Sequence, residues 1–194
     1  MAPLDPNAQD HRFAVSLSLV EQAIRALLVA IGEDPCRDGL KDTPSRVARF
    51  WKEFIDYDAG NCTAAFQHVK TDQMIVVSGL RVWSLCEHHL LPFSCDITAG
   101  YIARGKVLGL SKFARIAHSV SHRLQIQERI VHQIADSVQH LTGANDVAVI
   151  SKGEHLCMTM RGIKTQGTMA TSVMRGSFRH SPEARAEFME LARG

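Results

Sequence analysis

Two short segments carry cysteine and histidine at spacings that suit a metal ion. CEHHLLPF (86–93) places Cys86 and His89 three residues apart, so both side chains can reach one ion if the chain turns sharply. EHLCMTMRG (154–162) offers His155 and Cys157 two residues apart, on the same face of an expected strand. Thiolate and imidazole are preferred zinc donors, so Cys86, His89 and Cys157 form a candidate ligand set. These three ligands would leave the fourth coordination position of the ion for water or substrate, as in catalytic zinc sites.

Two other interpretations of these residues stay open. Cys86 and Cys157 could be buried small hydrophobic residues, because free cysteine is among the most buried residue types. Alternatively, His88 or His155 could complete a closed structural site with four ligands. Sequence spacing alone does not separate the closed site from the open one.

Four cationic side chains stand where they could hold an anion: Lys112, Arg115, Arg46 and Arg161. GLSKFARIA (109–117) puts the first two, with Ser111, at an expected helix start, where cations oppose the helix dipole unless an anion binds the free N–H groups. Arg46 occupies a similar first turn, and Arg161 follows the second cysteine–histidine segment. For each residue alone, solvated surface charge is the simpler interpretation, whereas four cations near one metal site would favour an anionic ligand.

A third pair of residues suits recognition of a base. RLQIQERI (123–130) puts Gln127 and Glu128 at the start of an amphipathic helix. An acid in a first helical turn is favourable without any function. A carboxylate can also accept hydrogen bonds from both N1–H and the 2-amino group of guanine, a donor pair that adenine lacks.

Helices and strands that could position these residues follow from hydrophobic periodicity. We expect helices over 20–31, over 43–57 with Thr43 as cap and Pro44 at its first position, over 111–120 with Ser111 as cap, over 127–141, and from Ser181 onward. Strands are expected over 74–79, 97–103, 146–150, 155–161 and 168–174. This order predicts an α+β fold, an antiparallel sheet with helices on one face, after an N-terminal helical unit. Residues 1–12 are expected to be mobile.

Composition limits the class of protein. The 194 residues are 45% hydrophobic and 22% charged, which excludes a largely disordered chain. With 22 Lys+Arg against 20 Asp+Glu, the net charge of +2 gives no argument for a nucleic-acid or membrane partner. The chain has five cysteines and no Cys-x-x-Cys pair, which indicates reduced thiols or metal ligands. No signal peptide or membrane span is recognisable, so we expect a cytoplasmic protein.

Several segments together resemble GTP cyclohydrolase I: CEHHLLPF, GLSKFARI, RLQIQERI, EHLCMTMRG and TSVMRGSF, in the family's order, with a similar helical leader in GEDPCRDGLKDTPSRVARF. The resemblance covers residues 20–191. It implies a zinc hydrolase that converts GTP and water to formate and 7,8-dihydroneopterin triphosphate, the first step of tetrahydrofolate and pterin biosynthesis. It also implies a tunnelling fold, an antiparallel four-stranded sheet with two helices, over 61–194 after a helical extension at 1–60. Family members form toroidal homodecamers with active sites at subunit interfaces.

The resemblance also implies roles for individual residues. Cys86, His89 and Cys157 correspond to the zinc ligands, and His88 and His155 to proton-handling histidines. Gln127 and Glu128 match the guanine-binding residues, and Ser111 lies near the ribose, with a part in its proton transfers. The remaining matches, at the triphosphate, are Lys112, Arg115, Arg161 and Arg46.

One segment departs from the family pattern. Many relatives have an aromatic residue and then Gly-Lys after the LPF of CEHHLLPF, whereas this chain has Ser94, Cys95 and Asp96. The loss of a glycine could change a local turn, and Asp96 could alter the mouth of the site. Cys95 is most simply a residue of the fold.

Two rival functions make different predictions. Another tunnelling-fold enzyme that acts on a pterin or a deazapurine, such as a nitrile reductase, needs a nucleophilic cysteine and nicotinamide. A zinc-stabilised oligomer without catalytic activity needs a closed metal site and gives no formate from GTP. The Cys86, His89 and Cys157 set, with two flanking histidines, favours the hydrolase.

Overall fold

The computed structural model describes residues 14–62, 65–67 and 72–193. The expectation for residues 1–12 therefore lies outside the described residues. The chain forms two compact units, one over Asp10–Asp58 and a larger one from Ala59 onward. None of the described helices is long and apolar enough to cross a membrane.

The smaller unit is a pair of helices that pack against each other, α1 (Leu17–Ala30) and α2 (Thr43–Ile55). The backbone N–H of Leu19 donates to the Ser16 hydroxyl, which caps α1. In α2 the cap is Asp42, so Thr43 already belongs to the helix, and the helix ends before the expected Tyr57.

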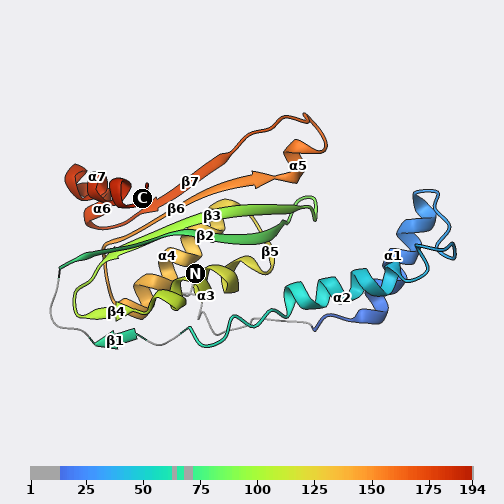
Figure 1. Ribbon diagram of the computed structural model, residues 1–194, viewed down its shortest axis with the longest axis horizontal. Coiled ribbons are helices and arrows are strands. Elements are labelled where there is room, and N and C mark those ends of the chain that lie inside the picture. Colours follow the sequence, from blue (N-terminus) through green and yellow to red (C-terminus); the bar gives the residue numbers. More distant parts are fainter. Residues whose placement is uncertain (1–13, 63–64, 68–71, 194) are drawn as a thin grey trace. The chain divides into compact units, whose positions relative to one another are not determined.

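The larger unit is built on a mixed five-stranded sheet of order β5-β2-β3-β6-β7 (Figure 1). Four strands pair antiparallel: β2 (Met74–Cys86), β3 (Pro92–Ile102), β6 (Val147–His155) and β7 (Met169–Met174). The short β5 (Leu124–Gln125) pairs parallel with Leu85 and Cys86 of β2. The sheet therefore has one strand more than the four-stranded antiparallel sheet that was expected. A separate ribbon joins β1 (Ala65–Gln67) to β4 (Lys106–Leu108).

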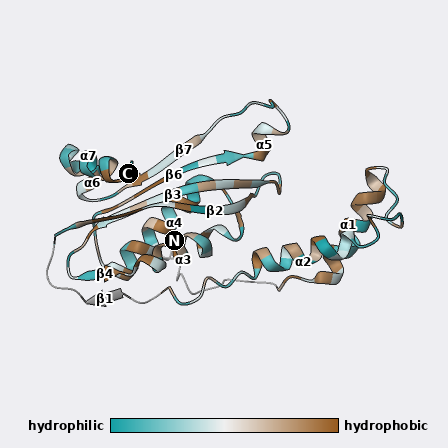
Figure 2. Ribbon diagram, viewed as in Figure 1, coloured by the Kyte–Doolittle hydropathy of each residue, from teal (hydrophilic) through white to brown (hydrophobic). Residues whose placement is uncertain are grey.

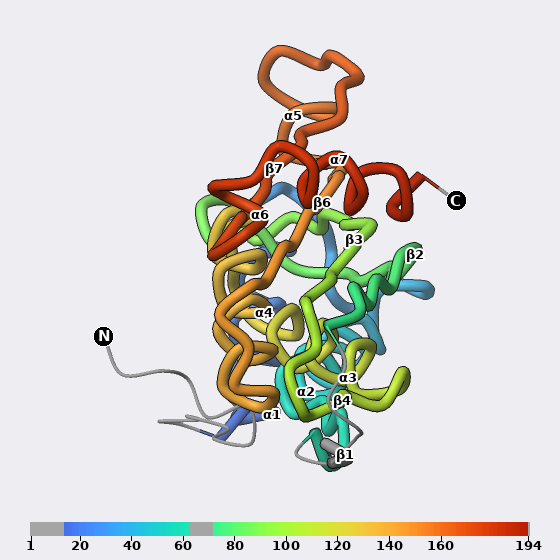
Figure 3. The backbone as a smooth tube through the Cα atoms, turned by 90° about the vertical axis from the view of Figure 1, so that its left-hand side faces the viewer, coloured from blue at the N-terminus to red at the C-terminus, as the bar shows by residue number. Residues whose placement is uncertain are grey.

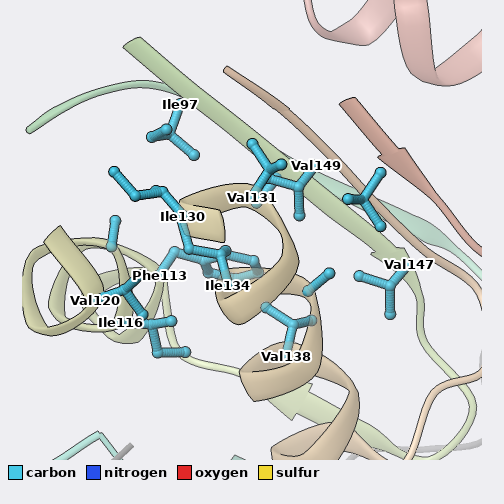
Figure 4. Packing of buried hydrophobic residues seen from close by; sticks show 14 of the residues in the cluster. Ile97, Phe113, Ile116, Val120, Ile130, Val131, Ile134, Val138, Val147 and Val149 are labelled. Atoms are coloured by element: carbon cyan, nitrogen blue, oxygen red, sulfur yellow. The ribbon is translucent and has the colours of Figure 1, made fainter. Parts of the chain in front are cut away.

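Helices cover both faces of this sheet, whereas one face was expected (Figures 1 and 3). On one face lie α3 (Leu110–Ser121) and α4 (Gln127–Thr142). Figure 2 colours both helices with apolar and polar residues, as helices with one buried side require. Figure 4 shows Phe113 and Ile116 of α3 beside Ile130 and Ile134 of α4, all of them fully buried. The N-terminal cap of α3 is Gly109. Ser111 was expected to be this cap, but it lies in the first turn of the helix.

The other face is covered at one end by α6 (Ser177–His180) and α7 (Pro182–Leu191). Phe178 and Phe188 are fully buried there and pack against apolar residues of the sheet. The Ser181 hydroxyl accepts from the N–H of Ala184 at 3.1 Å, which confirms the expected helix start. Gly143, at φ +72°, ends α4 in the left-handed conformation that glycine favours.

Two predicted strands have different limits. The run over 74–79 is only the first half of β2, which continues through a bulge between Val77 and Leu80, where Gly79 has φ +72°. The run over 155–161 is not a strand, because β6 ends at His155 and the short helix α5 (Leu156–Thr159) follows.

The segment that departs from the family pattern lies within the regular strand β3. Asp96 faces Arg81 of β2 in the pairing register and accepts two hydrogen bonds from its guanidinium, at 2.8 and 2.7 Å. This pairing lowers the pKa of the Asp96 carboxyl. Cys95 is 1% exposed, and burial raises the pKa of its thiol to about 11. Ser94, Cys95 and Asp96 therefore pair in regular register with β2.

Candidate metal centre and active site

A tight turn between β2 and β3 brings Cys86 and His89 together. The Leu90 N–H donates to the Cys86 carbonyl at 2.8 Å, and the Cys86 N–H donates to the Leu91 carbonyl at 2.8 Å. Leu90 has φ +57°, an uncommon left-handed conformation for a non-glycine residue. The turn sets His89 Nδ1 3.6 Å from Cys86 Sγ.

The third residue of the set, Cys157, follows the far end of β6. The register pairs Phe93 with His155, so the end of β6 lies beside the start of β3. The α5 turn follows at once, and Figure 1 shows it at the same end of the sheet as the β2–β3 hairpin. Donor atoms of Cys86, His89 and Cys157 all lie within 4.8 Å of one another, and this is the one such group among the described residues. We call these three residues the metal group.

These donors fit a divalent cation with a preference for sulfur and nitrogen. Burial is the main cause that raises the pKa of the Cys157 thiol. The adjacent Cys86 raises it further, because two neighbouring thiolates repel each other. A bound cation removes that repulsion, and two thiolates with one imidazole are a zinc-type set. His88 Nδ1 is 3.9 Å from Cys86 Sγ but lies outside the group of three. Arg161 Nη1 lies 3.2 Å from His89 Nε2.

His155 is held beside this group without belonging to it. Its ring stacks on buried Phe93, with centroids 4.6 Å apart and planes at 9°. His155 Nε2 lies 2.8 Å from Gln127 Oε1. Burial lowers the pKa of His155, while nearby Glu128 acts in the opposite direction. The ring is therefore biased toward the neutral form, which has one nitrogen free to accept a proton.

Gln127 and Glu128 begin α4 but have different surroundings. Gln127 is 1% exposed, and its amide NH2 faces the carbonyls of Ser151 and Met169 at 3.2 and 3.0 Å. Its amide is thus hydrogen-bonded within the chain. The expected contact of Gln127 with guanine stays a prediction. Glu128 is exposed in the first helical turn and close enough to His155 to affect its pKa.

A salt bridge between two residues that were not among the predicted site residues, Glu87 and Arg129, joins the β2–β3 hairpin, which carries Cys86 and His89, to α4. Arg129 donates from Nη1 to Glu87 Oε2 at 2.6 Å and from Nη2 to Glu87 Oε1 at 3.1 Å. The hydrogen bond from Arg129 lowers the pKa of the Glu87 carboxyl. Each partner is adjacent in sequence to a residue already chosen, Cys86 or Glu128, and that adjacency was the available signal.

The α3 residues lie elsewhere in the chain. Ser111 is exposed, Lys112 donates to the Asn61 carbonyl, and Arg115 donates to the Ala59 carbonyl at 2.8 Å. The last turn of α3 leads into β5, which pairs with Cys86, so the first turn begins about 15 Å farther back along the helix. Figure 1 agrees, because β4, directly before α3, lies at the end opposite the β2–β3 hairpin. Within one chain, Ser111, Lys112 and Arg115 therefore lie far from Cys86, His89 and Cys157.

Arg46 belongs to the smaller unit. It lies in the first turn of α2, where its guanidinium pairs with Asp42 at 3.2 Å, and both side chains are largely exposed. Within its own unit, this ion pair accounts for the position of Arg46.

Comparison with known proteins places the chain in a family. The family model described as GTP cyclohydrolase I matches residues 20–193. The GTP cyclohydrolase 1 of Pseudoalteromonas translucida is 43% identical over 183 residues, covering 90% of this chain and 98% of that protein. That of Alkalilimnicola ehrlichii is 46% identical over 180 residues, covering 90% and 97%. A crystal structure of apo archaeosine synthase QueF-Like aligns at TM-score 0.41 and 18% identity, covering 53% of this chain and 95% of that one. From the family match and these full-length relatives, the chain belongs to the GTP cyclohydrolase I family.

Proposed function

We propose that this chain is a zinc-dependent hydrolase that opens GTP at guanine C8 and releases formate and 7,8-dihydroneopterin triphosphate. The observation that carries the proposal is the convergence of Cys86, His89 and Cys157 from two distant segments, beside the half-buried His155, which lies outside the set. Membership of the family supports the same activity. One water enters and one carbon leaves as formate, so the net reaction is a hydrolysis.

Cys86, His89 and Cys157 would hold the zinc ion through two thiolates and one imidazole. Bound there, zinc supplies Lewis acidity and lowers the pKa of a coordinated water from 15.7 to about 7. Among the described residues the group offers three donors, the number of protein ligands that a catalytic zinc site uses. Glu87 and Arg129 hold the hairpin that carries two of the ligands.

His155 and His88 are the proposed proton-transfer residues. C8 of guanine is a poor electrophile, and protonation at N7 makes it a better one. His88 is exposed on the β2–β3 hairpin and can donate such a proton, while the neutral His155 suits proton acceptance. After formate leaves, the ribose opens, undergoes an Amadori-type rearrangement and recloses as the pterin ring. Ser111 is the further candidate for proton transfers at the ribose.

The substrate is proposed to span two copies of the chain. Glu128 lies close to His155, and Arg161 contacts His89, so both are near the metal group. Ser111, Lys112 and Arg115 of α3 are not near it in the same chain. The triphosphate subsite then needs the first turn of α3 from a neighbouring copy. This division supports an active site at a subunit interface, within the homodecamer that the family resemblance implies. Arg46 remains a proposed triphosphate residue from the helical unit.

The direct test is purified protein incubated with GTP, with formate and an oxidised fluorescent pterin measured together. We expect both products in equal amounts, and their loss with a zinc chelator, followed by recovery on zinc addition. No formate from zinc-loaded protein would contradict the proposal and favour the non-catalytic oligomer. Conversion of a deazapurine nitrile with nicotinamide would favour the rival enzyme.

Glu128→Gln is expected to weaken GTP binding, because the carboxylate that accepts from N1–H and the 2-amino group is lost. Hydrogen bonds to a charged group contribute about 1.5–3 kcal/mol, so the dissociation constant should rise roughly 10- to 100-fold. Titration in a His155→Ala background, expected to leave GTP unconsumed, measures it.

Glu190→Gln, a matched change at an exposed position of α7, is the control and should leave GTP affinity unchanged. Inosine triphosphate lacks the 2-amino group, so the preference for GTP over this analogue should also shrink in Glu128→Gln. An unaltered preference would remove Glu128 from base recognition.

A further inference from the structure

The Gln127 side chain is enclosed by protein on both sides of its amide. Its NH2 group faces three acceptors, the carbonyls of Ser151 and Met169 and the hydroxyl of Thr171, at 3.2, 3.0 and 3.4 Å. Its carbonyl oxygen faces His155 Nε2 at 2.8 Å. The reverse orientation would turn the oxygen toward two carbonyl oxygens, which cannot donate. The surroundings therefore fix the amide with its oxygen toward His155.

This fixed acceptor decides which nitrogen of the His155 ring carries the proton of the hydrogen bond. Because Gln127 Oε1 can only accept, His155 Nε2 must carry the proton of the hydrogen bond. The lone pair of the neutral ring is then on Nδ1. Phe93, stacked on the ring, holds its plane, so plane and tautomer are set by different neighbours.

We propose that Gln127 is a positioning residue, whose buried amide keeps His155 in the Nε2–H tautomer with Nδ1 as the proton-accepting nitrogen. This inference rests on the proposed function and deepens it, since it reassigns Gln127 from guanine binding to orientation of the proton-transfer histidine. A wrong tautomer presents an N–H where the reaction needs a lone pair, so the cost falls on turnover.

Gly153 is an independent sign that the sheet is shaped around this amide. A Cβ built at Gly153 of β6 would lie 2.3 Å from Gln127 Oε1 and 3.0 Å from its Cδ. Any other residue there would displace the oxygen that faces His155. Gly153 lacks a positive φ, so the side chain of Gln127 and the nearby Ser94 carbonyl, and not backbone conformation, oppose a substitution.

The main test replaces Gln127 with methionine, which has similar length and no amide. Zinc-loaded protein is labelled with 15N at the histidine rings and studied by solid-state NMR, with the His155 signals identified by their loss in His155→Phe. We expect the Nε2–H tautomer in the unsubstituted protein and a tautomer mixture in Gln127→Met. We also expect kcat to fall roughly 10- to 100-fold, while KM for GTP changes less than about threefold.

Gln133→Met is the matched control, because Gln133 is a second buried glutamine of α4 that contacts Gln125 and not His155. It should show a comparable loss of thermal stability with an unchanged His155 tautomer. Gly153→Ala should reproduce the effects of Gln127→Met while keeping both functional groups, and it covers the case in which Gln127→Met fails to fold.

The outcomes separate this inference from the proposed function. If the unsubstituted protein forms no formate, the function is wrong, and the NMR comparison still tests tautomer control by itself. If it forms formate, an unchanged His155 tautomer in the variants overturns the inference. A rise in KM without a fall in kcat also overturns it and restores Gln127 to guanine binding.

Discussion

Cys157→Ser is expected to remove zinc and activity together. Cys157 is the one proposed ligand of the group that comes from outside the β2–β3 hairpin, and a serine hydroxyl does not ionise to a comparable donor near neutral pH. The remaining Cys86 and His89 hold a metal ion poorly. We expect zinc retained after dialysis to fall tenfold or more, and kcat/KM on the order of a thousandfold or more.

Metal analysis and the formate assay on the same preparation measure both effects. Cys36→Ser is the matched control, since Cys36 is an exposed free cysteine of the smaller unit, and it should retain both zinc and turnover. Full zinc content in Cys157→Ser would exclude Cys157 as a ligand. Loss of zinc in His88→Ala would instead point to the closed four-ligand site.

Local chemistry explains which parts of the fold could be predicted. Gly143 ends α4 and Ser181 begins α7 because their conformational and capping preferences act within a few residues. The grouping of Cys86, His89 and Cys157 was also predictable, since thiolate and imidazole are residue types that suit a shared metal ion. These predictions depended on residue type, and for Gly143 and Ser181 also on short spacing, whereas Cys157 is distant in sequence from Cys86 and His89.

The incorrect predictions depend on distant partners. HLCMTMR (155–161) alternates as a strand does, yet pairing stops at Phe93 and His155, because the preceding residue of β3 is Pro92, which has no N–H to donate. Exposed Leu156 and Met160 then lie outside the sheet. The parallel pairing of β5 with Cys86 was missed for the same reason, because it depends on contacts far along the chain that local periodicity does not encode. The enclosure of Gln127, on which no prediction was made, also depends on distant contacts.

The separation of the α3 cations from the metal group leads to the second large effect. Cys157→Ser and the double variant Lys112→Ala/Arg115→Ala should each be nearly inactive alone, because one lacks the metal and the other the triphosphate cations. If an active site combines the metal group of one copy with α3 of another, mixed oligomers contain some intact sites. Random assembly of equal amounts should leave about a quarter of the sites intact, with a corresponding recovery of activity.

Co-expression with two different affinity tags and sequential purification would isolate such mixed oligomers for the formate assay. The matched control pairs Cys157→Ser with His89→Ala, two changes in the same metal group. No site in that mixture contains an intact group, so no activity should return. Recovery in the first mixture alone would assign the α3 cations to a neighbouring copy. Equal inactivity of both mixtures, with mixed oligomers confirmed by mass spectrometry, would contradict the shared site and leave the triphosphate without these cations.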